Sequence, residues 1–162
     1  MATMRVEVVS PERALFAGEA TEVYARSMDG EIGILPGHQP ALLLLDVAPL
    51  KVRADDGQEH VFAVHSGFLE FSDNRLTVLA DVAEPVGEID VARAQAARQR
   101  AEEALRGDAE DAAVRTALAR ATLRTDLSGN LTRGGVLAGE PCGNNCLPRA
   151  LSSSLDGDVN RA

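Results

Sequence analysis

The sequence has 162 residues, of which 45% are hydrophobic and 25% charged, as is typical of a globular protein with one good core. Its net charge of −9 and its pI near 4.8 argue against a broad electrostatic surface for nucleic acid or anionic lipid. Residues 1–14 lack the pattern of a secretory signal, and the longest strongly apolar run, residues 41–45, is far shorter than the ~18 residues of a membrane span. We therefore expect a cytosolic protein that meets a membrane only through a partner.

Turn signals divide residues 4–84 into short stretches that alternate apolar and polar residues, as half-buried antiparallel strands do. The dipeptides Asp56-Gly57 and Asp73-Asn74 are favourable hairpin turns. The alternating stretches are residues 5–9, 21–27, 50–54, 60–64 and 75–83. Several short strands with tight turns predict an antiparallel β-sandwich domain over residues 1–87.

After residue 87 the pattern becomes helical. Asp90 is well placed to cap a helix over residues 91–106, which Gly107 ends. Asp108 is expected to open a second helix that reaches residue 127.

Each expected helix carries a stripe of mostly small apolar residues, and the two stripes can face one another. They are Ala94, Ala97, Ala101, Ala104 and Leu105 in the first helix, and Ala113, Ala117, Leu118 and Ala121 in the second. We predict a mainly β plus α protein whose residues 88–127 form an antiparallel helical hairpin. Because alanine buries little apolar area, this hairpin should open at modest cost.

Residues 128–162 are rich in Gly, Ser, Asn and Pro, and we predict a disordered or loosely ordered tail. The only two cysteines, Cys142 and Cys146, lie in this tail without a neighbouring His, too few ligands for a structural zinc site. We interpret them as incidental thiols and expect no metal. A local disulfide is disfavoured in the cytosol.

The glycine-rich stretch GEIGILPGHQP, residues 30–40, raises the question of a phosphate-binding loop. Such a loop needs a helix after it and usually a lysine, but two prolines forbid a helix here and no lysine precedes Lys51. We interpret the stretch as an ordered loop between strands, with Gly30, Gly33 and Gly37 at positions of positive φ. It either makes contacts or merely turns the chain.

Three stretches in order, GEIGILPGHQPALL, HSGFLEFSDNRLTVLADVAE and EIDVARAQAARQRAEEAL, resemble the epsilon subunit of F-type, proton-translocating ATP synthase. The resemblance covers roughly residues 4–127, and the tail departs from the family pattern. It implies a β-sandwich at the foot of the central stalk that binds the gamma subunit and the ring of c subunits. It also implies a peripheral membrane protein at the cytoplasmic face of the bacterial cell membrane.

The resemblance gives the loop a role, because in the family it meets the polar loops of the c ring. The matching residues are Gly30, Glu31, Gly33, Pro36 and His38. Glu31 would offer a carboxylate to a partner, and His38 would orient the loop or hydrogen-bond to gamma. The alternative is that Glu31 is an ordinary solvated residue.

The resemblance also implies a regulatory ATP site, and we expect no required cofactor. The residues that match the family pattern by position are Glu84, Ile89, Asp90, Arg93, Ala94 and Arg100. Arg120 and Arg124 match only in spacing and approximate place. Four converging guanidinium groups would repel one another unless an anion such as a triphosphate lay between them. The alternative is solvated arginines balanced by Glu102, Glu103, Asp108 and Asp111.

The implied mechanism has two states: with ATP the hairpin stays folded on the sandwich, and without it the helices extend toward the alpha and beta subunits and inhibit ATP hydrolysis. A catalytic role is disfavoured, because His38, His60 and His65 lack a ligand cluster and the serine of residues 65–67 lacks a nucleophile elbow. The competing hypothesis is a free nucleotide-sensing or adaptor module that joins no rotor.

Overall fold

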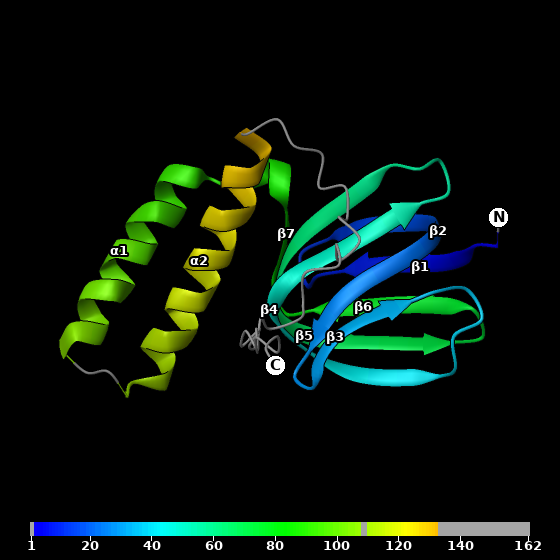
Figure 1. The fold of residues 1–162 in the computed structure, drawn as a ribbon, viewed down its shortest axis with the longest axis horizontal. Helices are drawn as coiled ribbons and strands as arrows, with labels where there is room; N and C mark the ends of the chain where they lie inside the picture. The colour runs from blue at the N-terminus through cyan, green and yellow to red at the C-terminus, as the bar shows by residue number, and fades with distance from the viewer. Residues whose placement is uncertain (1, 108–109, 133–162) are drawn as a thin grey trace, which may run out of the picture.

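The computed structural model describes residues 2–107 and 110–132, which form two parts. Figure 1 shows a β-sandwich on one side and a pair of antiparallel helices packed against one end of it. The second helix lies between the first helix and the sandwich, where it contacts β4, β5 and the short 3-10 helix η1. The predicted sandwich with a helical hairpin is therefore confirmed.

Seven strands form one sheet that closes on itself. They are β1 (Met4–Val9), β2 (Ala14–Ser27), β3 (Gly30–Ile34), β4 (Ala41–Ala54), β5 (Glu59–Ser72), β6 (Arg75–Ala80) and β7 (Ala83–Pro85). The order is β1-β6-β5-β4-β2-β3, β7 pairs with β5, and β1 also pairs with β2. Every pair is antiparallel except β1–β6, which is parallel. Because β1 joins both neighbours, the sheet encloses its core as a flattened barrel does.

The sandwich core is mainly aliphatic, as the scarcity of aromatic residues requires. Val6 and Val8 on β1 are fully buried, and the residues beside them face outward, as the period of two predicts. Phe62 and Phe71 are the buried aromatic residues of this cluster. The sandwich therefore has a close-packed core of its own that does not need the helices.

Both predicted hairpin turns are confirmed. Asp73 and Asn74 have φ values of 48° and 58°, the left-handed conformation that a tight turn between twisted strands requires. Gly57, with φ of 84°, closes the turn from β4 to β5.

A bend at Ser66 and Gly67 divides β5 into two halves. The φ of Ser66 is 83° and that of Gly67 is 140°, and a Cβ on Gly67 would lie 2.3 Å from the carbonyl oxygen of Leu79. Only glycine fits there. Before the bend the even-numbered Phe62 and Val64 enter the sandwich core, and after it the odd-numbered Leu69 and Phe71 do. The bend therefore reverses which side chains point outward.

The helical part begins with η1 (Val86–Glu88), followed by α1 (Val91–Gly107) and α2 (Ala112–Thr132). Asp90 caps α1 as predicted: its Oδ1 accepts a hydrogen bond from the Arg93 N–H at 3.0 Å. The helix ends at Gly107, also as predicted.

The start predicted for the second helix is wrong. The cap of α2 is Asp111, whose Oδ1 accepts from the N–H groups of Ala113 at 2.8 Å and Val114 at 3.2 Å. Asp108 itself lies outside the described residues. The helix continues to Thr132, past the predicted end at residue 127. Residues 133–162, which include Cys142 and Cys146, also lie outside the described residues.

The predicted stripes are confirmed in part. Ala94, Ala101 and Ala121 are buried, whereas Ala104, Ala113 and Ala117 are exposed. Leu118 is partly buried, as the predicted stripe requires, and Val114, which the stripe did not include, is partly buried in place of Ala113. The packed face of α2 therefore follows residues 114, 118 and 121, which share one stripe by i, i+4 and i, i+3 spacing.

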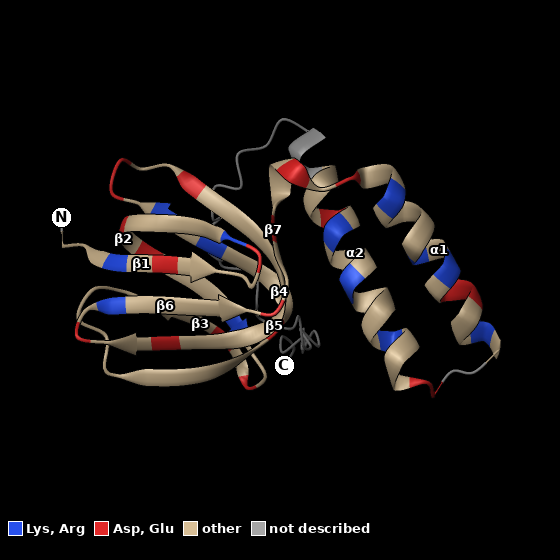
Figure 2. Ribbon diagram, turned by 180° about the vertical axis from the view of Figure 1, so that it is seen from behind, with Lys and Arg blue, Asp and Glu red and all other residues tan. Residues whose placement is uncertain are grey.

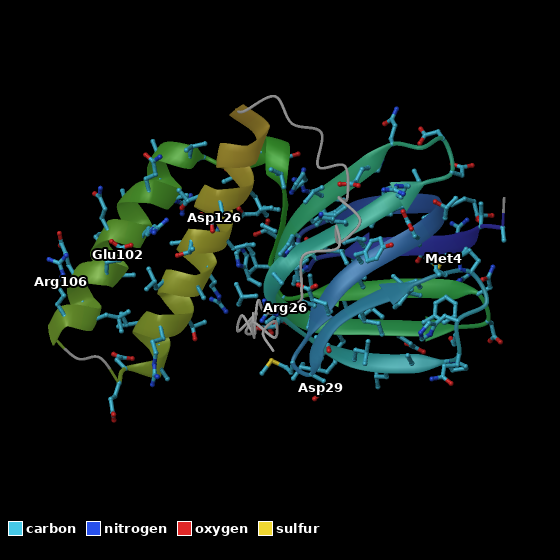
Figure 3. The ribbon with its side chains drawn as sticks, viewed as in Figure 1. Met4, Arg26, Asp29, Glu102, Arg106 and Asp126 are labelled. Atoms are coloured by element: carbon cyan, nitrogen blue, oxygen red, sulfur yellow. The ribbon has the colours of Figure 1, made fainter. Side chains whose placement is uncertain are left out.

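A second apolar cluster holds the hairpin to the sandwich. It contains Ala63, Val86, Ile89, Ala94 and Leu127, with Val61 and Leu123 packed against it. Arg98 of α1 lies 2.8 Å from Glu102 of the same helix and 4.0 Å from Asp126 of α2, and both acidic side chains are seen in Figure 3. These ion pairs are exposed and contribute little. The docked hairpin therefore depends on a small cluster beside a large core.

Candidate functional site

The glycine-rich stretch is half strand and half turn, so the interpretation as a loop is wrong for residues 30–34. Residues 30–34 form β3, which pairs with β2 and sets Glu31 opposite Arg26. Gly30 and Gly37 have positive φ values of 133° and 81°, as predicted. Gly33 does not, so the prediction is wrong there. A side chain at Gly33 would be crowded for another reason, because its Cβ would lie 3.0 Å from the Tyr24 ring.

The turn after β3 is fixed to the rest of the sandwich. The Gly37 N–H donates to the Asn74 Oδ1 at 3.1 Å, and the Asn74 amide donates to the Thr3 carbonyl at 2.8 Å. His38 lies edge-on to the Phe71 ring, and its Nδ1 is 2.7 Å from the Gln39 carbonyl oxygen. His38 therefore serves as a support of the loop.

The outer face of β4, β5 and β6 carries a row of exposed apolar side chains. Leu44 lies directly opposite Phe68, and Phe68 lies opposite Leu79, so the three share one face. Their exposed fractions are 48%, 52% and 53%, and that of Leu42 in the next row is 70%. We call these four residues the apolar outer patch. Such a continuous patch on a sheet indicates a partner.

Between the sandwich and α2 lies a charged junction. Arg124 binds Glu84 of β7 through two hydrogen bonds, Nε to Oε2 at 2.9 Å and Nη2 to Oε1 at 2.6 Å. The hydrogen bonds and charge of Arg124 lower the pKa of Glu84, against the effect of partial burial, and His65 and Arg93 contribute in the same direction. The bidentate pair holds α2 against β7.

His65 and Arg120 complete the junction. His65 on β5 has no exposed surface, and neither ring nitrogen has a hydrogen-bond partner among the described residues. The buried Nε of Arg120 also lacks a partner there. Burial, followed by the charge of Arg124, lowers the pKa of His65 to about 4, and Arg120 adds to this whereas Glu84 opposes it.

The predicted nucleotide residues are therefore only partly brought together. Glu84, Arg93, Arg120 and Arg124 share the junction's electrostatics, while Ile89 and Ala94 are buried in the cluster beside it. Arg100 is exposed, and its Nε donates to the Ala96 carbonyl at 3.3 Å. Asp90 acts as a helix cap. The four-arginine clamp stays a prediction.

Sequence reasoning missed the position of His65. The sequence offers a signal in the dipeptide Ser66-Gly67 that follows it, because a glycine inside a strand indicates a bend. Whether His65 then faces the sandwich core or the hairpin depends on pairing and packing with residues distant in the chain.

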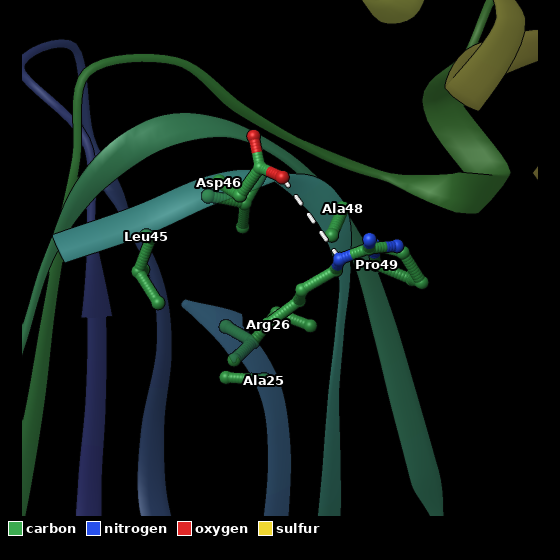
Figure 4. Close-up of a pocket in the computed structure, with 8 residues that line it drawn as sticks. Ala25, Arg26, Leu45, Asp46, Ala48 and Pro49 are labelled. Carbon is green, nitrogen blue, oxygen red and sulfur yellow. Dashed lines mark ion pairs between the residues drawn. The ribbon is translucent and has the colours of Figure 1, made fainter. Parts of the chain in front are cut away.

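Basic positions recur along α2, as Figure 2 shows, in a chain of net negative charge. A separate small pocket lies between β2, the middle of β4 and β5, with Arg26 and Asp46 at 3.9 Å across it (Figure 4). It holds at most about one water molecule, which excludes it as a nucleotide site.

Among the described residues no His, Cys, Asp and Glu side chains are grouped to hold a metal ion.

Family comparisons agree with both parts of the fold. Residues 3–86 match the model of the ATP synthase delta/epsilon chain β-sandwich domain, and residues 88–129 match that of its long α-helix domain. The chain belongs to the ATP synthase delta/epsilon chain family.

Curated relatives within this family are named ATP synthase epsilon chain. That of Streptomyces avermitilis is 47% identical over 100 residues, which cover 62% of this chain and 81% of the relative. That of Bordetella avium is 50% identical over 123 residues, with coverage of 74% and 86%.

Solved structures share the fold. A chain of the Euglena gracilis mitochondrial ATP synthase, in a structure of its F1 and c-ring parts, matches with a TM-score of 0.61 and 19% identity, covering 83% of this chain and 82% of that one. A chain of the Tetrahymena thermophila central stalk and c ring matches with a TM-score of 0.50 and 19% identity, covering 81% and 97%. In the part of this chain that the structure describes, no helix is long and apolar enough to span a membrane.

The Glu84–Arg124 pair should hold the hairpin down. Substituting Glu84→Gln and Arg124→Gln, singly and together, should give a coupling free energy of about 1 kcal/mol for docking, because the pair is bidentate and half-buried. Docking is measured by alkylation of a cysteine at Ala63, beneath the hairpin, in a chain with Cys142→Ser and Cys146→Ser. The alkylation rate reports transient opening when closing is fast.

A cysteine at the exposed Glu70 gives the rate without protection, so the ratio of the two rates is the measure. Arg98→Gln is the matched control, because its ion pairs are exposed and its removal should leave the ratio nearly unchanged. If the effects of the two single substitutions at the Glu84–Arg124 pair simply add, the pair does not hold the hairpin.

Proposed function

We propose that this chain is the non-catalytic epsilon subunit of the rotor of an F-type ATP synthase, where it couples proton flow through the c ring to ATP synthesis. The observation that carries the proposal is a rigid closed sandwich with an uncovered apolar patch and a weakly held helical hairpin. Relatives named ATP synthase epsilon chain support it, as does the fold shared with chains of F1, c-ring and central-stalk structures.

The apolar outer patch is the proposed contact with the gamma subunit. Its four side chains lie about half exposed or more on a continuous sheet surface that the described helices do not cover. A stiff sheet transmits torque better than a loop, because a close-packed core resists shear. The partner should offer apolar side chains, since burial of this surface is favourable in proportion to its area.

The c ring is the proposed partner of the β3 region. Glu31 projects from a strand whose ends are set by Gly30 and by the turn through Pro36, and His38 anchors that turn. A carboxylate held on such a fixed loop can pair with a cationic or amide group of the ring's polar loops. The subunit would thus reach the cytoplasmic face of the bacterial membrane as a peripheral protein.

Phe68→Asp, or the double substitution Leu44→Ser/Leu79→Ser, should reduce co-purification of the subunit with gamma at least ~10-fold, because a charge or two polar groups would be buried at the contact. The measurement is a pull-down from detergent-solubilised membranes. Val91→Ser on α1 is the matched control, an exposed apolar residue outside the patch that should leave assembly intact.

In the same pull-down, Glu31→Lys should retain gamma and lose c subunits. Equal recovery of the c ring would reject the Glu31 contact. A wild-type subunit found only in the soluble fraction, without gamma, would favour the free sensing module.

The hairpin is proposed to inhibit ATP hydrolysis when it leaves the sandwich and extends toward the alpha and beta subunits. The docked cluster contains few residues, and two of its buried members are alanines, so the two states differ by a small free energy. Truncation after Glu88 should therefore raise ATP hydrolysis by the assembled complex severalfold, measured as phosphate release. Truncation after Thr132, which leaves both helices, is the control and should not. Unchanged hydrolysis after the first truncation excludes inhibition.

A regulatory ATP is proposed to bind at the junction and favour the docked state. Arg93 and Arg124 act on the carboxylate of Glu84 there, and Arg120 and Arg124 act on His65 beside it, an excess of positive charge that suits a triphosphate. ATP would then stabilise docking in proportion to its concentration relative to its dissociation constant.

Arg93→Ala should weaken ATP binding to the isolated subunit by about 10-fold or more, because a charge-assisted contact to phosphate is lost. Calorimetry measures the dissociation constant. Arg106→Ala, in the last turn of α1, is the control and should bind like the wild type. Identical ATP affinities for Arg93→Ala and the wild type would contradict the proposed ATP site.

A further inference from the structure

His65 is a buried titratable residue that the proposed nucleotide site does not use. It lies in the first half of β5 on the same face as Val61 and Ala63, which pack against the hairpin. It has no exposed surface, and both ring nitrogens lack partners among the described residues. A buried imidazole in this position is held neutral, because a proton on it would find no acceptor.

The charges that face His65 come from two other elements. Arg120 and Arg124 approach it from α2, and Glu84 approaches it from β7. Its partner on β4 is Val47, which is apolar. Both arginines disfavour an imidazolium, and the one carboxylate that favours it already binds Arg124. The docked hairpin therefore disfavours protonation of His65.

We propose that His65 is a proton-operated latch between the two parts of the chain: the neutral ring permits α2 to dock on β5, and protonation releases the hairpin. The inference rests on the proposed function only in requiring that the hairpin can leave the sandwich. Release removes the cover over His65 and takes both arginines of α2 away from it. In the inhibitory scheme proposed above, acidification would then suppress ATP hydrolysis.

The direction of the pH dependence follows from the docked and released states. Docking lowers the pKa of His65 from 6.5 to about 4. The stabilisation of the docked state is thus complete well above pH 6.5 and declines as the pH falls from there toward 4. Between pH 7.5 and 5.5 the opening equilibrium should rise by about tenfold.

The Glu84–Arg124 pair does not account for a change in this range. In the docked state the pKa of Glu84 is lowered from 4.5, so Glu84 is charged in both states at pH 5.5 and above. Loss of that pair begins only at lower pH. The interval from pH 7.5 to 5.5 therefore separates titration of His65 from loss of the Glu84–Arg124 pair.

The test uses the full chain with the cysteine at Ala63 and the ratio of its alkylation rate to that of the cysteine at Glu70. The ratio should rise about tenfold from pH 7.5 to 5.5 in the wild-type background. His65→Gln, which cannot titrate, should give a constant ratio. His38→Gln is the matched control, since His38 lies on the β3–β4 turn against Phe71, and it should keep the tenfold rise.

A His65→Gln ratio that still rises tenfold would overturn the latch, and so would a wild-type ratio that does not change. A second measurement needs no substitution at all: histidine NMR signals of the wild-type chain should show His65 neutral at pH 5.5 in the docked state. A charged His65 in a docked hairpin at that pH would also overturn it. Failure of the proposed rotor function is distinguishable, because it appears as loss of gamma co-purification whatever the alkylation ratio does.

Discussion

The bend at Ser66 and Gly67 determines which way each surface of the protein faces. Close approach to the Leu79 carbonyl leaves no room for a side chain on Gly67, so the strand must turn there. The reversal of faces gives the first half of β5 to the hairpin and exposes Phe68 on the opposite half. A single strand thus connects the apolar outer patch, the core and the charged junction, and these surfaces cannot shift independently.

The two apolar clusters differ greatly in how strongly they hold their elements together. The sandwich core contains large aliphatic and aromatic side chains from all of β1 to β6, and its sheet closes through β1. The hairpin is held by Leu123, Leu127 and a few Ile, Val and Ala side chains, together with one half-buried ion pair. Each buried leucine contributes only about 2 kcal/mol, so the hairpin can leave while the sandwich stays intact.

Local features of the chain were predictable from the sequence, and long-range ones were not. The alternating strands, the Asp73-Asn74 turn and the Asp90 cap follow from neighbouring residues, and the structure has all of them. The parallel β1–β6 pair, the reason for Gly33 and the burial of His65 depend on residues far along the chain. The start of α2 was missed because Asp108 and Asp111 are equally good caps by type, and only packing chooses between them.

The junction has a charge imbalance that explains why two different ligands could act on it. When the hairpin is docked, the carboxylate of Glu84 interacts with Arg93 and Arg124, and Arg120 and Arg124 lie near His65 beside it. A proton on His65 would add to this excess, whereas a triphosphate would remove it. Protons and ATP would therefore shift the same equilibrium in opposite directions. The docked hairpin would then persist when ATP is abundant and the surroundings are not acidic, and it would open when both conditions fail.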